Sequence, residues 1–409
     1  MKVETSPPPI TVVGVGADGW AGVPERLRAL VLTAEVVLGG RRHLAMLPDA
    51  PGQLRRAWPS PLREGLGPLL DSLESRRVVA LASGDPLVSG IGTTLVALLG
   101  TDAVRVEPAV SSVALARARM GWSAHGCAVV SLVGRDPRLL MRELSPGRRV
   151  LVLSSDATTP GTVAALLVGS GYGSSRLTVL GDLGSDTESR SSTTADDLLG
   201  GSFEKVPRLH VLALELSGPA GYGLVPGLPD AAFEHDGQLT KRDLRASALA
   251  RLAPSPGLHL WDVGAGAGSV AVEWMRAHPS CAATAVEADP GRAERIGRNA
   301  GRLGVPGLRV VTGRAPDALT GLDAPDAVFV GGGATRPGVL DTCLEALGPG
   351  GRIVVHGVTL ETEHLLAEAY RRHGGELSRL AVETAAPVGT FTGWTPARTV
   401  TQWYLSRDR

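Results

Sequence analysis

The hydrophobic residues of this chain are grouped in short β-branched runs, which alternate with longer stretches rich in leucine, alanine and arginine. Between residues 10 and 216 the runs read ITVVGVG, VVLGG, RVVALAS, VRVEPA, CAVVSLVG, RRVLVLSS, LTVLGDLG and LHVLALEL. Strands separated by helical segments are typical of largely parallel α/β sheets, which bind ligands at the carboxyl ends of their strands. The predicted strands fit one sheet or two small subdomains, with the segment TDAVRVEPAVSS as the crossing point between two.

A second alternation follows a stretch that has no hydrophobic periodicity. The stretch SGPAGYGLVPGLPD is dense in glycine and proline, and it therefore predicts a domain boundary. The later runs are LHLWDVGAG, CAATAVEAD, LRVVTGR, AVFVGGG and GRIVVHGV, with a final pair around LAVETAA and RTVTQWYLSR. We predict a disordered lead-in over residues 1–9, a first α/β domain over 10–216, a linker over 217–232 and a second α/β domain over 233–409.

The second domain is predicted to open with a loop and an amphipathic helix, FEHDGQLTKRDLRASALARLAP. Thr240 is the expected N-cap, and Asp243 three residues later would complete a pair similar to a capping box. The strand count, with the terminal pair reversed, resembles the sheet of class I methyltransferases. The resemblance implies a Rossmann-like second domain.

Composition narrows the function classes. The chain has 409 residues, with 41 lysines and arginines balanced by 41 aspartates and glutamates. A neutral chain is not expected to bind nucleic acid or anionic membranes through general charge attraction. There is no apolar run near the roughly 20 residues of a membrane helix and no signal-peptide pattern, so we expect a soluble, cytoplasmic protein. The three cysteines are widely spaced, so no zinc site or disulfide framework is predicted, and we expect no metal.

The loop after the run LHLWDV carries three glycines at alternate positions, Gly264, Gly266 and Gly268. A dinucleotide-binding loop has the pattern G-x-G-x-x-G, and here the third glycine comes one residue early. A strand, loop and helix of this kind suit a smaller anion, such as an amino-acid carboxylate near the helix N-terminus. At the end of the next strand, Glu287 is expected to accept hydrogen bonds from both hydroxyls of an adenosine ribose.

Two later segments favour S-adenosylmethionine over a dinucleotide. VTGRAPDAL contains Arg314 and Ala315, which would flank an adenine, and LGPGGRIVV leads into the fifth strand. With the glycine loop, these segments resemble the successive motifs of class I S-adenosylmethionine methyltransferases. FEHDGQLTKRDLRA, FVGGG and VTLET further resemble the branch that methylates carbon 15 of a precorrin and removes an acetate carboxyl. The cofactor residues that the resemblance implies are Thr240, Asp262, Gly264, Ala265, Gly266, Ala267, Gly268, Glu287, Arg314 and Ala315.

The first half carries its own ordered motifs, VVGVGADGW, VVLGGRRHL, WPSPL, LASGDPLVSGIGTTL and VEPAVSSVALA. They resemble the tetrapyrrole methylase family, and GGRRHL with WPSPL resembles its branch that methylates carbon 5 of the same macrocycle. The resemblance implies two α/β subdomains with S-adenosylmethionine folded between them. The implied cofactor residues are Gly84, Asp85, Pro86, Val88, Ser111 and Ser112. Many family members read G-x-G-P-G-D at the first loop, whereas here the acid is displaced to Asp18.

Together the resemblances imply one fused S-adenosylmethionine-dependent C-methyltransferase of cobalamin biosynthesis, with one cofactor site in each domain. It would convert precorrin-6B to precorrin-8 by methylation at C5 and C15 with loss of carbon dioxide. The substrate carries many carboxylates, so basic residues must bind it. We expect Arg242, Arg245, Arg336 and His43 to do so, and His356, Lys241 and Asp18 to act in catalysis. For His356, a hydrogen-bonded core position fits the sequence equally well.

Other functions remain open on the sequence alone. Both methylase folds also occur in enzymes that modify RNA, although the neutral charge argues against nucleic acid as a partner. A cofactor-binding sensor without catalysis is a further alternative. The substrate is either a metal-free precorrin or its cobalt-containing counterpart of the anaerobic route. Both halves resemble enzymes that self-associate, so we also expect a homo-oligomer, with no membrane partner.

Overall fold

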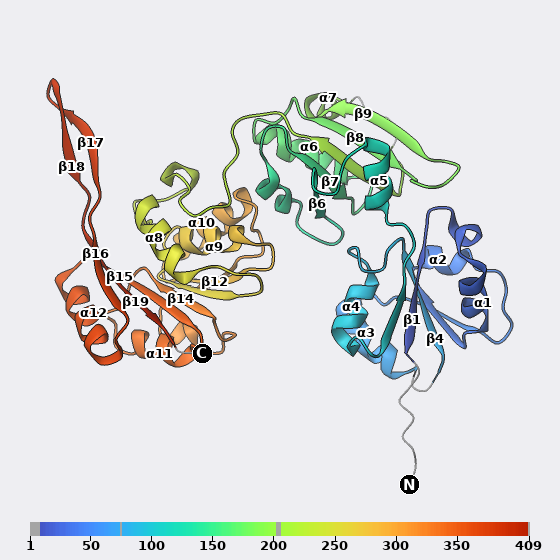
Figure 1. The fold of residues 1–409 in the computed structure, drawn as a ribbon, viewed down its shortest axis with the longest axis horizontal. Coiled ribbons are helices and arrows are strands. Elements are labelled where there is room, and N and C mark those ends of the chain that lie inside the picture. The colour runs from blue at the N-terminus through green and yellow to red at the C-terminus, as the bar shows by residue number, and fades with distance from the viewer. Residues whose placement is uncertain (1–8, 74–75, 202–205, 408–409) are drawn as a thin grey trace, which may run out of the picture. The chain divides into compact units, whose positions relative to one another are not determined.

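The computed structural model describes residues 9–73, 76–201 and 206–407, so most of the predicted lead-in lies outside the described residues. The chain forms two compact units (Figure 1). The first comprises Met1–Pro137 and Ser145–Pro219, and the second comprises Arg138–Leu144 and Ala220–Arg409. Residues 138–144, which the sequence assigned to the first domain, therefore belong to the second unit. Within the predicted linker, Leu228 and Ala232 lie in the core of the second unit.

The first sheet is entirely parallel, with the strand order β3-β2-β4-β1-β5. Its strands are β1 (Ile10–Val15), β2 (Val36–Gly39), β3 (Leu54–Ala57), β4 (Val78–Ser83) and β5 (Val104–Glu107). The helices are α1 (Glu25–Thr33), α2 (Arg41–Ala45), α3 (Leu62–Asp71) and α4 (Ile91–Leu99). The central strands are buried on both faces, as their continuous apolar runs predict.

The second sheet of the first unit is mixed, with the order β6-β7-β10-β8-β9. Its elements are β6 (Ala128–Ser131), β7 (Arg149–Leu153), β8 (Arg176–Gly181), β9 (Ser189–Thr194) and β10 (His210–Glu215), with α5 (Ser112–Met120), α6 (Thr159–Gly169) and α7 (Ala195–Leu199). Two sheets that separate after β5 confirm the predicted subdomains and their crossing point. The expectation of largely parallel strands is wrong for this sheet, because β10 pairs antiparallel with β7 and β8.

The second unit contains a seven-stranded sheet with the order β13-β12-β11-β14-β15-β19-β16. Its strands are β11 (His259–Val263), β12 (Ala282–Glu287), β13 (Arg309–Thr312), β14 (Ala327–Val330), β15 (Arg352–Gly357), β16 (Glu376–Leu380) and β19 (Val400–Ser406). The helices are α8 (Arg242–Leu252), α9 (Ser269–Ala277), α10 (Pro290–Arg302), α11 (Val339–Ala346) and α12 (Leu360–His373). The predicted class I sheet is thus confirmed.

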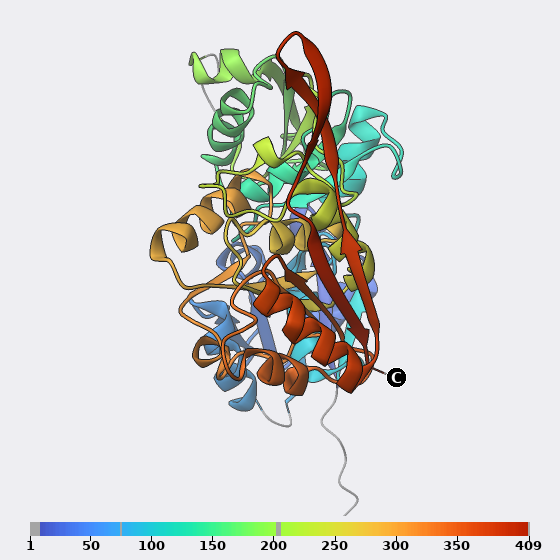
Figure 2. The same cartoon turned by 90° about the vertical axis from the view of Figure 1, so that its left-hand side faces the viewer.

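Two details of this sheet differ from the sequence prediction. Only β19 runs against its neighbours, because it inserts antiparallel between β15 and β16. The sixth strand ends where LAVETAA begins, and that run instead leads into a separate hairpin of β17 (Glu383–Val388) and β18 (Phe391–Pro396). Figures 1 and 2 show this hairpin extending well beyond the sheet as a twisted ribbon.

The entry helix begins later than its capping pattern predicts. Lys241 is the N-cap of α8, and its side chain makes no capping hydrogen bond. Thr240 is therefore not the N-cap; its carbonyl oxygen accepts a hydrogen bond from the buried side chain of Arg245. Among the described residues, no helix is both long and apolar enough to cross a bilayer.

Candidate cofactor sites

The glycine loop of the second unit follows β11 and depends on backbone conformations that favour glycine. Gly264, Gly266 and Gly268 all have positive φ, at 68°, 59° and 73°. A Cβ on Gly264 would lie 2.6 Å from the Gly332 carbonyl oxygen, and one on Gly268 would lie 2.7 Å from the Ile296 side chain. The first glycine thus admits the loop after β14, and the third admits α10.

Glu287 ends β12 directly beside this loop. Its Oε2 accepts a hydrogen bond from the Gly266 N–H at 2.8 Å, and its Oε1 accepts one from the Asp289 N–H at 3.0 Å. The residue is only 6% exposed, so the two backbone donors compensate for the loss of water around the carboxylate. Each oxygen has further acceptor capacity, which suits the two hydroxyls of a ribose.

A cavity of about 340 Å³ opens over the glycine loop and Glu287. The predicted residues that line it are Gly264, Gly266, Glu287, Arg314, Ala315 and Arg336. Lining residues that sequence reasoning did not single out include Gln238, Arg292, Gly313 and the glycines 331–333. Gln238 lies in the segment DGQLT and the glycines 331–333 lie in FVGGG, and both segments are part of the resemblance described above. The backbone cradle and the buried acid fit an adenosyl cofactor.

Four predicted cofactor residues support the loop without lining this cavity. Ala265 and Ala267 are buried, and Gly268 packs against α10. Asp262 is fully buried, and its Oδ2 accepts a hydrogen bond from the Ala271 N–H at 3.0 Å. Burial, with a smaller contribution from the nearby Glu287, raises the pKa of Asp262 to about 7. Thr240, on the entry loop, is likewise absent from the lining.

Exchanging Asp262 for asparagine should change how stability depends on pH. The folded-state pKa is raised above that of an unfolded aspartate, so the stabilisation by this group is greatest at low pH and is lost as the pH rises from about 4 to about 7. We expect the wild type to lose stability across this window and D262N to lose less. Calorimetric melting of both proteins at pH 5 and pH 8 measures the difference. Parallel pH profiles would contradict the assignment.

The loop before α8 is fastened beside the glycine loop by α10. Asp236 pairs with Arg292 at 2.9 Å and with Arg295 at 3.2 Å, which lowers the pKa of its carboxyl. Asn299 is fully buried, and its amide donates to the carbonyls of Glu234 and Ala267, both at 3.0 Å. The entry loop and the glycine loop therefore share one buried anchor.

Arg245 is buried inside the second unit, which corrects the sequence prediction that it binds the substrate. Its guanidinium is fully buried and pairs with Glu273, which is itself 2% exposed. It also donates to the carbonyl oxygens of Leu228 and Thr240 and lies 3.3 Å from Asp230. The side chain holds the segment before α8 against α9 and cannot reach a ligand.

Lys241 and Arg242 lie at the exposed start of α8, outside the lining of the cavity. The Lys241 ammonium lies 3.7 Å from the Asp230 carboxylate. His356 is 9% exposed and is in the core, where its Nε2 lies 2.9 Å from the Gln402 amide oxygen and Phe329 packs edge-on against its ring. Burial lowers the pKa of His356 to about 4, so it is neutral near pH 7. The structure therefore supports the core position of His356 and not its predicted role in proton transfer.

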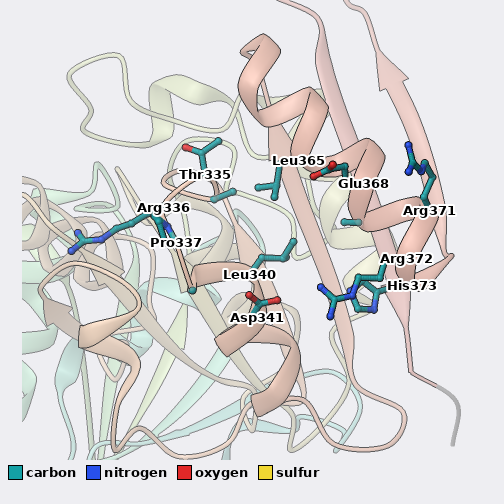
Figure 3. A pocket seen from close by; sticks show the side chains of 13 residues that line it. Thr335, Arg336, Pro337, Leu340, Asp341, Leu365, Glu368, Arg371, Arg372 and His373 are labelled. Carbon is teal, nitrogen blue, oxygen red and sulfur yellow. The ribbon is translucent and has the colours of Figure 1, made fainter.

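A larger cavity, about 570 Å³, lies between α11 and α12 (Figure 3). Leu340 and Leu365 contribute apolar surface, and the last turn of α12 contributes Arg371, Arg372 and His373. Of the predicted site residues, Arg336 alone lines this cavity; it also lines the smaller one and lies 3.5 Å from Asp317. The glycine loop and Glu287 line the smaller cavity and not this one, so the smaller cavity is the candidate cofactor site.

In the first unit, the loops after β1, β4 and β5 meet at the carboxyl edge of the parallel sheet. The Gly84 N–H donates to the Val15 carbonyl at 2.8 Å, and the Ala109 N–H donates to the Gly84 carbonyl at 3.2 Å. A Cβ on Gly14 would lie 2.0 Å from that carbonyl oxygen, so only glycine fits. Gly84 also lies against the backbone of Ser111, whose hydroxyl caps α5. The structure thus brings Gly84, Ser111 and Ser112 together.

The other predicted residues of this site have local structural partners. Asp85 accepts a hydrogen bond from the Leu87 N–H at 2.8 Å, and the buried Pro86 packs against the backbone of Gly90 and Gly92. Val88 packs against the core of the second subdomain. Asp18 is exposed, with its carboxylate close to the backbone of Gly16 and Gly22.

The facing edge of the second sheet carries buried polar atoms that the sequence did not indicate. Ser131 ends β6, Ser154 follows β7 and His210 begins β10 at the same edge. In the described part of the chain, no partner is found for the Ser131 hydroxyl, the Ser154 hydroxyl or the His210 Nε2. Buried polar atoms without partners are unfavourable, so this edge is a candidate ligand surface.

His43 is the last predicted residue of the first unit. It is 7% exposed on α2, where its Nε2 lies 3.1 Å from Arg42 and 3.2 Å from Ser83. Burial, assisted by Arg42, lowers the pKa of His43 to about 4. His43 is therefore a neutral, buried residue behind Arg42, and this position does not support the predicted role in binding the substrate. Over the described ranges, no cluster of three or more histidine, cysteine or acidic residues could hold a metal.

Comparison with known proteins agrees with both halves of this description. Residues 9–199 match the tetrapyrrole (corrin/porphyrin) methylases, and residues 231–407 match the precorrin methyltransferase domain. The chain is 44% identical over 399 residues to the precorrin-6Y C(5,15)-methyltransferase (decarboxylating) of Sinorhizobium sp. This alignment covers 97% of this chain and 96% of that protein.

Two Salmonella typhimurium proteins each match part of the chain. A cobalt-precorrin-7 C(5)-methyltransferase is 34% identical over 42% of this chain and 84% of its own length. A cobalt-precorrin-6B C(15)-methyltransferase (decarboxylating) is 35% identical over 37% of this chain and 80% of its own length. Fold and matched domains define an S-adenosylmethionine-dependent C-methyltransferase. Within that class, the chain belongs to the family of decarboxylating precorrin-6Y C(5,15)-methyltransferases.

Proposed function

We propose that this enzyme methylates a precorrin at C5 in its first unit and at C15 in its second, and that the second unit also releases a ring acetate carboxyl as carbon dioxide. Each unit binds its own S-adenosylmethionine. The observation that carries the proposal is the pair of glycine-lined loops in one chain, each at the carboxyl edge of parallel strands. The names of the two single-activity relatives support the same division.

In the second unit, Glu287 would hold the ribose, the glycines 264 and 266 would admit the cofactor backbone, and Arg314 and Ala315 would flank the adenine. The cofactor supplies an electrophilic methyl group on a sulfonium. Its nucleophile is a carbon of an electron-rich macrocycle, so the protein contributes chiefly orientation, which is worth up to about 7–11 kcal/mol. Glu287 is held by two backbone donors, and this rigidity fixes the cofactor before the ring arrives.

Decarboxylation requires that the electron pair left by carbon dioxide be taken up. The conjugated macrocycle accepts that pair once a neighbouring position is protonated. The chain contributes removal of water from one acetate and delivery of one proton. Because His356 is neutral and in the core, we assign this proton transfer to a group of the cavity or to water and not to His356.

Mass spectrometry of a precorrin-6B reaction tests this function. With methyl-labelled S-adenosylmethionine, we expect the product to gain two labelled methyl groups and to lose one carbon dioxide. A product with one methyl, or with both methyls and no carbon dioxide loss, would contradict the proposal. Labelled methyl groups recovered in added ribosomal RNA would favour the RNA-modifying alternative instead.

Whether the substrate ring already contains cobalt is a separate question. We propose the metal-free precorrin as the substrate, because a relative that matches 97% of this chain is named for precorrin-6Y, whereas the two Salmonella typhimurium relatives that match part of it are named for cobalt precorrins. Parallel reactions with metal-free and cobalt-loaded rings decide between them. We expect kcat/KM to be higher for the metal-free ring, and the reverse order would overturn this choice.

We also propose that the chain self-associates through the β17–β18 hairpin. Val388, Phe391 and Trp394 are exposed on it, at 59%, 80% and 72%. These two strands pair only with each other in the described structure, and an isolated two-stranded hairpin is marginally stable in water. Sedimentation should show an oligomer that dissociates when Phe391 and Trp394 are both changed to serine. A monomeric wild type would exclude this role.

A further inference from the structure

A cluster of charged side chains lies in the first unit where its two sheets approach each other. Arg42 comes from α2 of the first subdomain, whereas Asp182 and Arg208 flank strands β8 and β10 of the second. Asp182 and the segment of Arg208 are joined directly, because the Asp182 N–H donates to the Leu209 carbonyl at 2.9 Å. Arg42 lies within electrostatic range of both Asp182 and Arg208.

The charges in this cluster do not balance. Arg42 interacts electrostatically with one further cation, Arg208, and with one carboxylate, Asp182. Partial burial and the neighbouring Arg208 lower the pKa of Arg42, and Asp182 opposes that shift. A second acid, Asp156, interacts electrostatically with His210, but it is not among the charged groups that act on Arg42, which are Arg208 and Asp182. An added anion would therefore stabilise the cluster.

The contacts of Arg42 leave part of its donor fork available. Its Nη2 donates to the Ser83 hydroxyl at 3.2 Å and to the His43 Nε2 at 3.1 Å. Within the described residues, both side-chain hydrogen bonds of Arg42 use Nη2, and none uses Nε or Nη1. A guanidinium can only donate, so the His43 Nε2 must accept, and the neutral imidazole carries its proton on Nδ1. His43 thus fixes the orientation of Arg42 from behind.

This cluster lies beside the predicted cofactor loop. Ser83, which accepts a hydrogen bond from Arg42, immediately precedes Gly84. On the opposite sheet, Arg208 stands two residues before His210, whose Nδ1 donates to the Pro207 carbonyl at 2.8 Å and whose buried Nε2 is one of the unpartnered polar atoms. A ligand between these edges would meet a guanidinium from each subdomain.

We infer that Arg42 and Arg208 together bind one carboxylate side chain of the tetrapyrrole, and that His43 is a positioning residue for Arg42. The inference rests on the proposed C5 methylation in the first unit. The two arginines would then distinguish substrates by this carboxylate side chain. A macrocycle in which that carboxylate is esterified should be rejected. A planar carboxylate matches the guanidinium fork, which a lysine would not reproduce.

Kinetics of the separate methyl additions test the pair. We expect R42Q and R208Q each to raise KM for the precorrin in the C5 step by about tenfold or more, since each removes a charge-assisted hydrogen bond. KM for S-adenosylmethionine and the rate of the C15 step should stay unchanged. Arg41→Gln, an exposed neighbour on α2, is the matched control and should behave as wild type. If R42Q and R208Q lowered the melting temperature but left the precorrin KM unchanged, the inference would be overturned. Arg42 would then serve only to stabilise the contact between the sheets.

His43 is tested by a conservative pair. H43Q retains an acceptor that can face Arg42, whereas H43L does not. We expect H43L to raise the precorrin KM as R42Q does and H43Q to restore most of the difference, because only the acceptor orients Arg42. Equal effects of both variants on KM would show that His43 only fills space.

A binding measurement separates this inference from the proposed function. Uroporphyrin III, a stable porphyrin with eight carboxylates, should bind the full chain and quench its tryptophan fluorescence, and its octamethyl ester should bind much more weakly. R208Q, whose side chain is exposed, should weaken uroporphyrin binding by about tenfold without unfolding the chain. Equal binding to wild type and R208Q would refute the Arg42–Arg208 site even if both methyl transfers occur. If methyl transfer fails but this difference persists, only the proposed reaction is lost.

Discussion

Replacing Glu287 by alanine should abolish methylation at C15 and the release of carbon dioxide, while C5 methylation continues. The carboxylate joins the glycine loop to the cavity through the Gly266 N–H and is the single buried acid among the residues that line it. Loss of two charge-assisted hydrogen bonds to a ribose corresponds to at least a hundredfold loss in kcat/KM for that step. The product should carry one added methyl group by mass spectrometry.

Glu294→Ala is a suitable control for this variant, because Glu294 is an exposed acid on the neighbouring helix α10. It should leave both methyl additions intact. Glu287→Gln, which keeps an acceptor oxygen, should fall between the wild type and Glu287→Ala. If Glu287→Ala lost both additions equally, or lost only the C5 methyl, the division of the two reactions between the units would be wrong.

Arg245→Met should cost about 3–5 kcal/mol of stability in the second unit, which is the usual effect of removing one partner of a buried ion pair. The change leaves the Glu273 carboxylate buried without its cation, although the Gly227 and Leu228 N–H groups still donate to it, at 2.6 Å and 3.0 Å. Differential scanning calorimetry should show the transition of the second unit at a lower temperature, with the first unit unaffected.

The exposed neighbour Arg242 provides the matched control. Arg242→Met should shift the same transition by no more than about 0.5 kcal/mol, as substitutions away from buried partners usually do. If Arg245→Met were as stable as the wild type but raised the KM for the precorrin, Arg245 would be a substrate-binding residue after all.

The strands that the sequence predicted are those whose own residues carry a hydrophobic pattern. The strands β1, β4, β11 and β12 are buried on both faces, and each therefore has a mostly apolar run in its own sequence. Two strands of the first unit were missed, β3 with the sequence LRRA and β9 with SRSSTT, because each is a polar strand at the edge of its sheet. An edge strand is specified by its partner more than by its own pattern.

The features of the candidate sites also divide into those that the local sequence predicts and those that depend on partners far along the chain. Positive φ and close backbone approach restrict the loop around Gly264 to glycine, so the motif could be found from sequence alone. The roles of cations could not, since a guanidinium that binds an anionic ligand and one that pairs internally have the same local sequence. The partner of Arg245 is Glu273, on another helix, and only the packing of α8 against α9 reveals that pair. Likewise, Arg42 and His43 are adjacent, and only their contacts distinguish them.

Equilibrium dialysis of the full chain with labelled S-adenosylhomocysteine tests the central claim most directly, because it counts cofactor sites without requiring a substrate. We predict two molecules bound per wild-type chain and one per Glu287→Ala chain. Saturation of the wild type at a single molecule per chain would contradict the account.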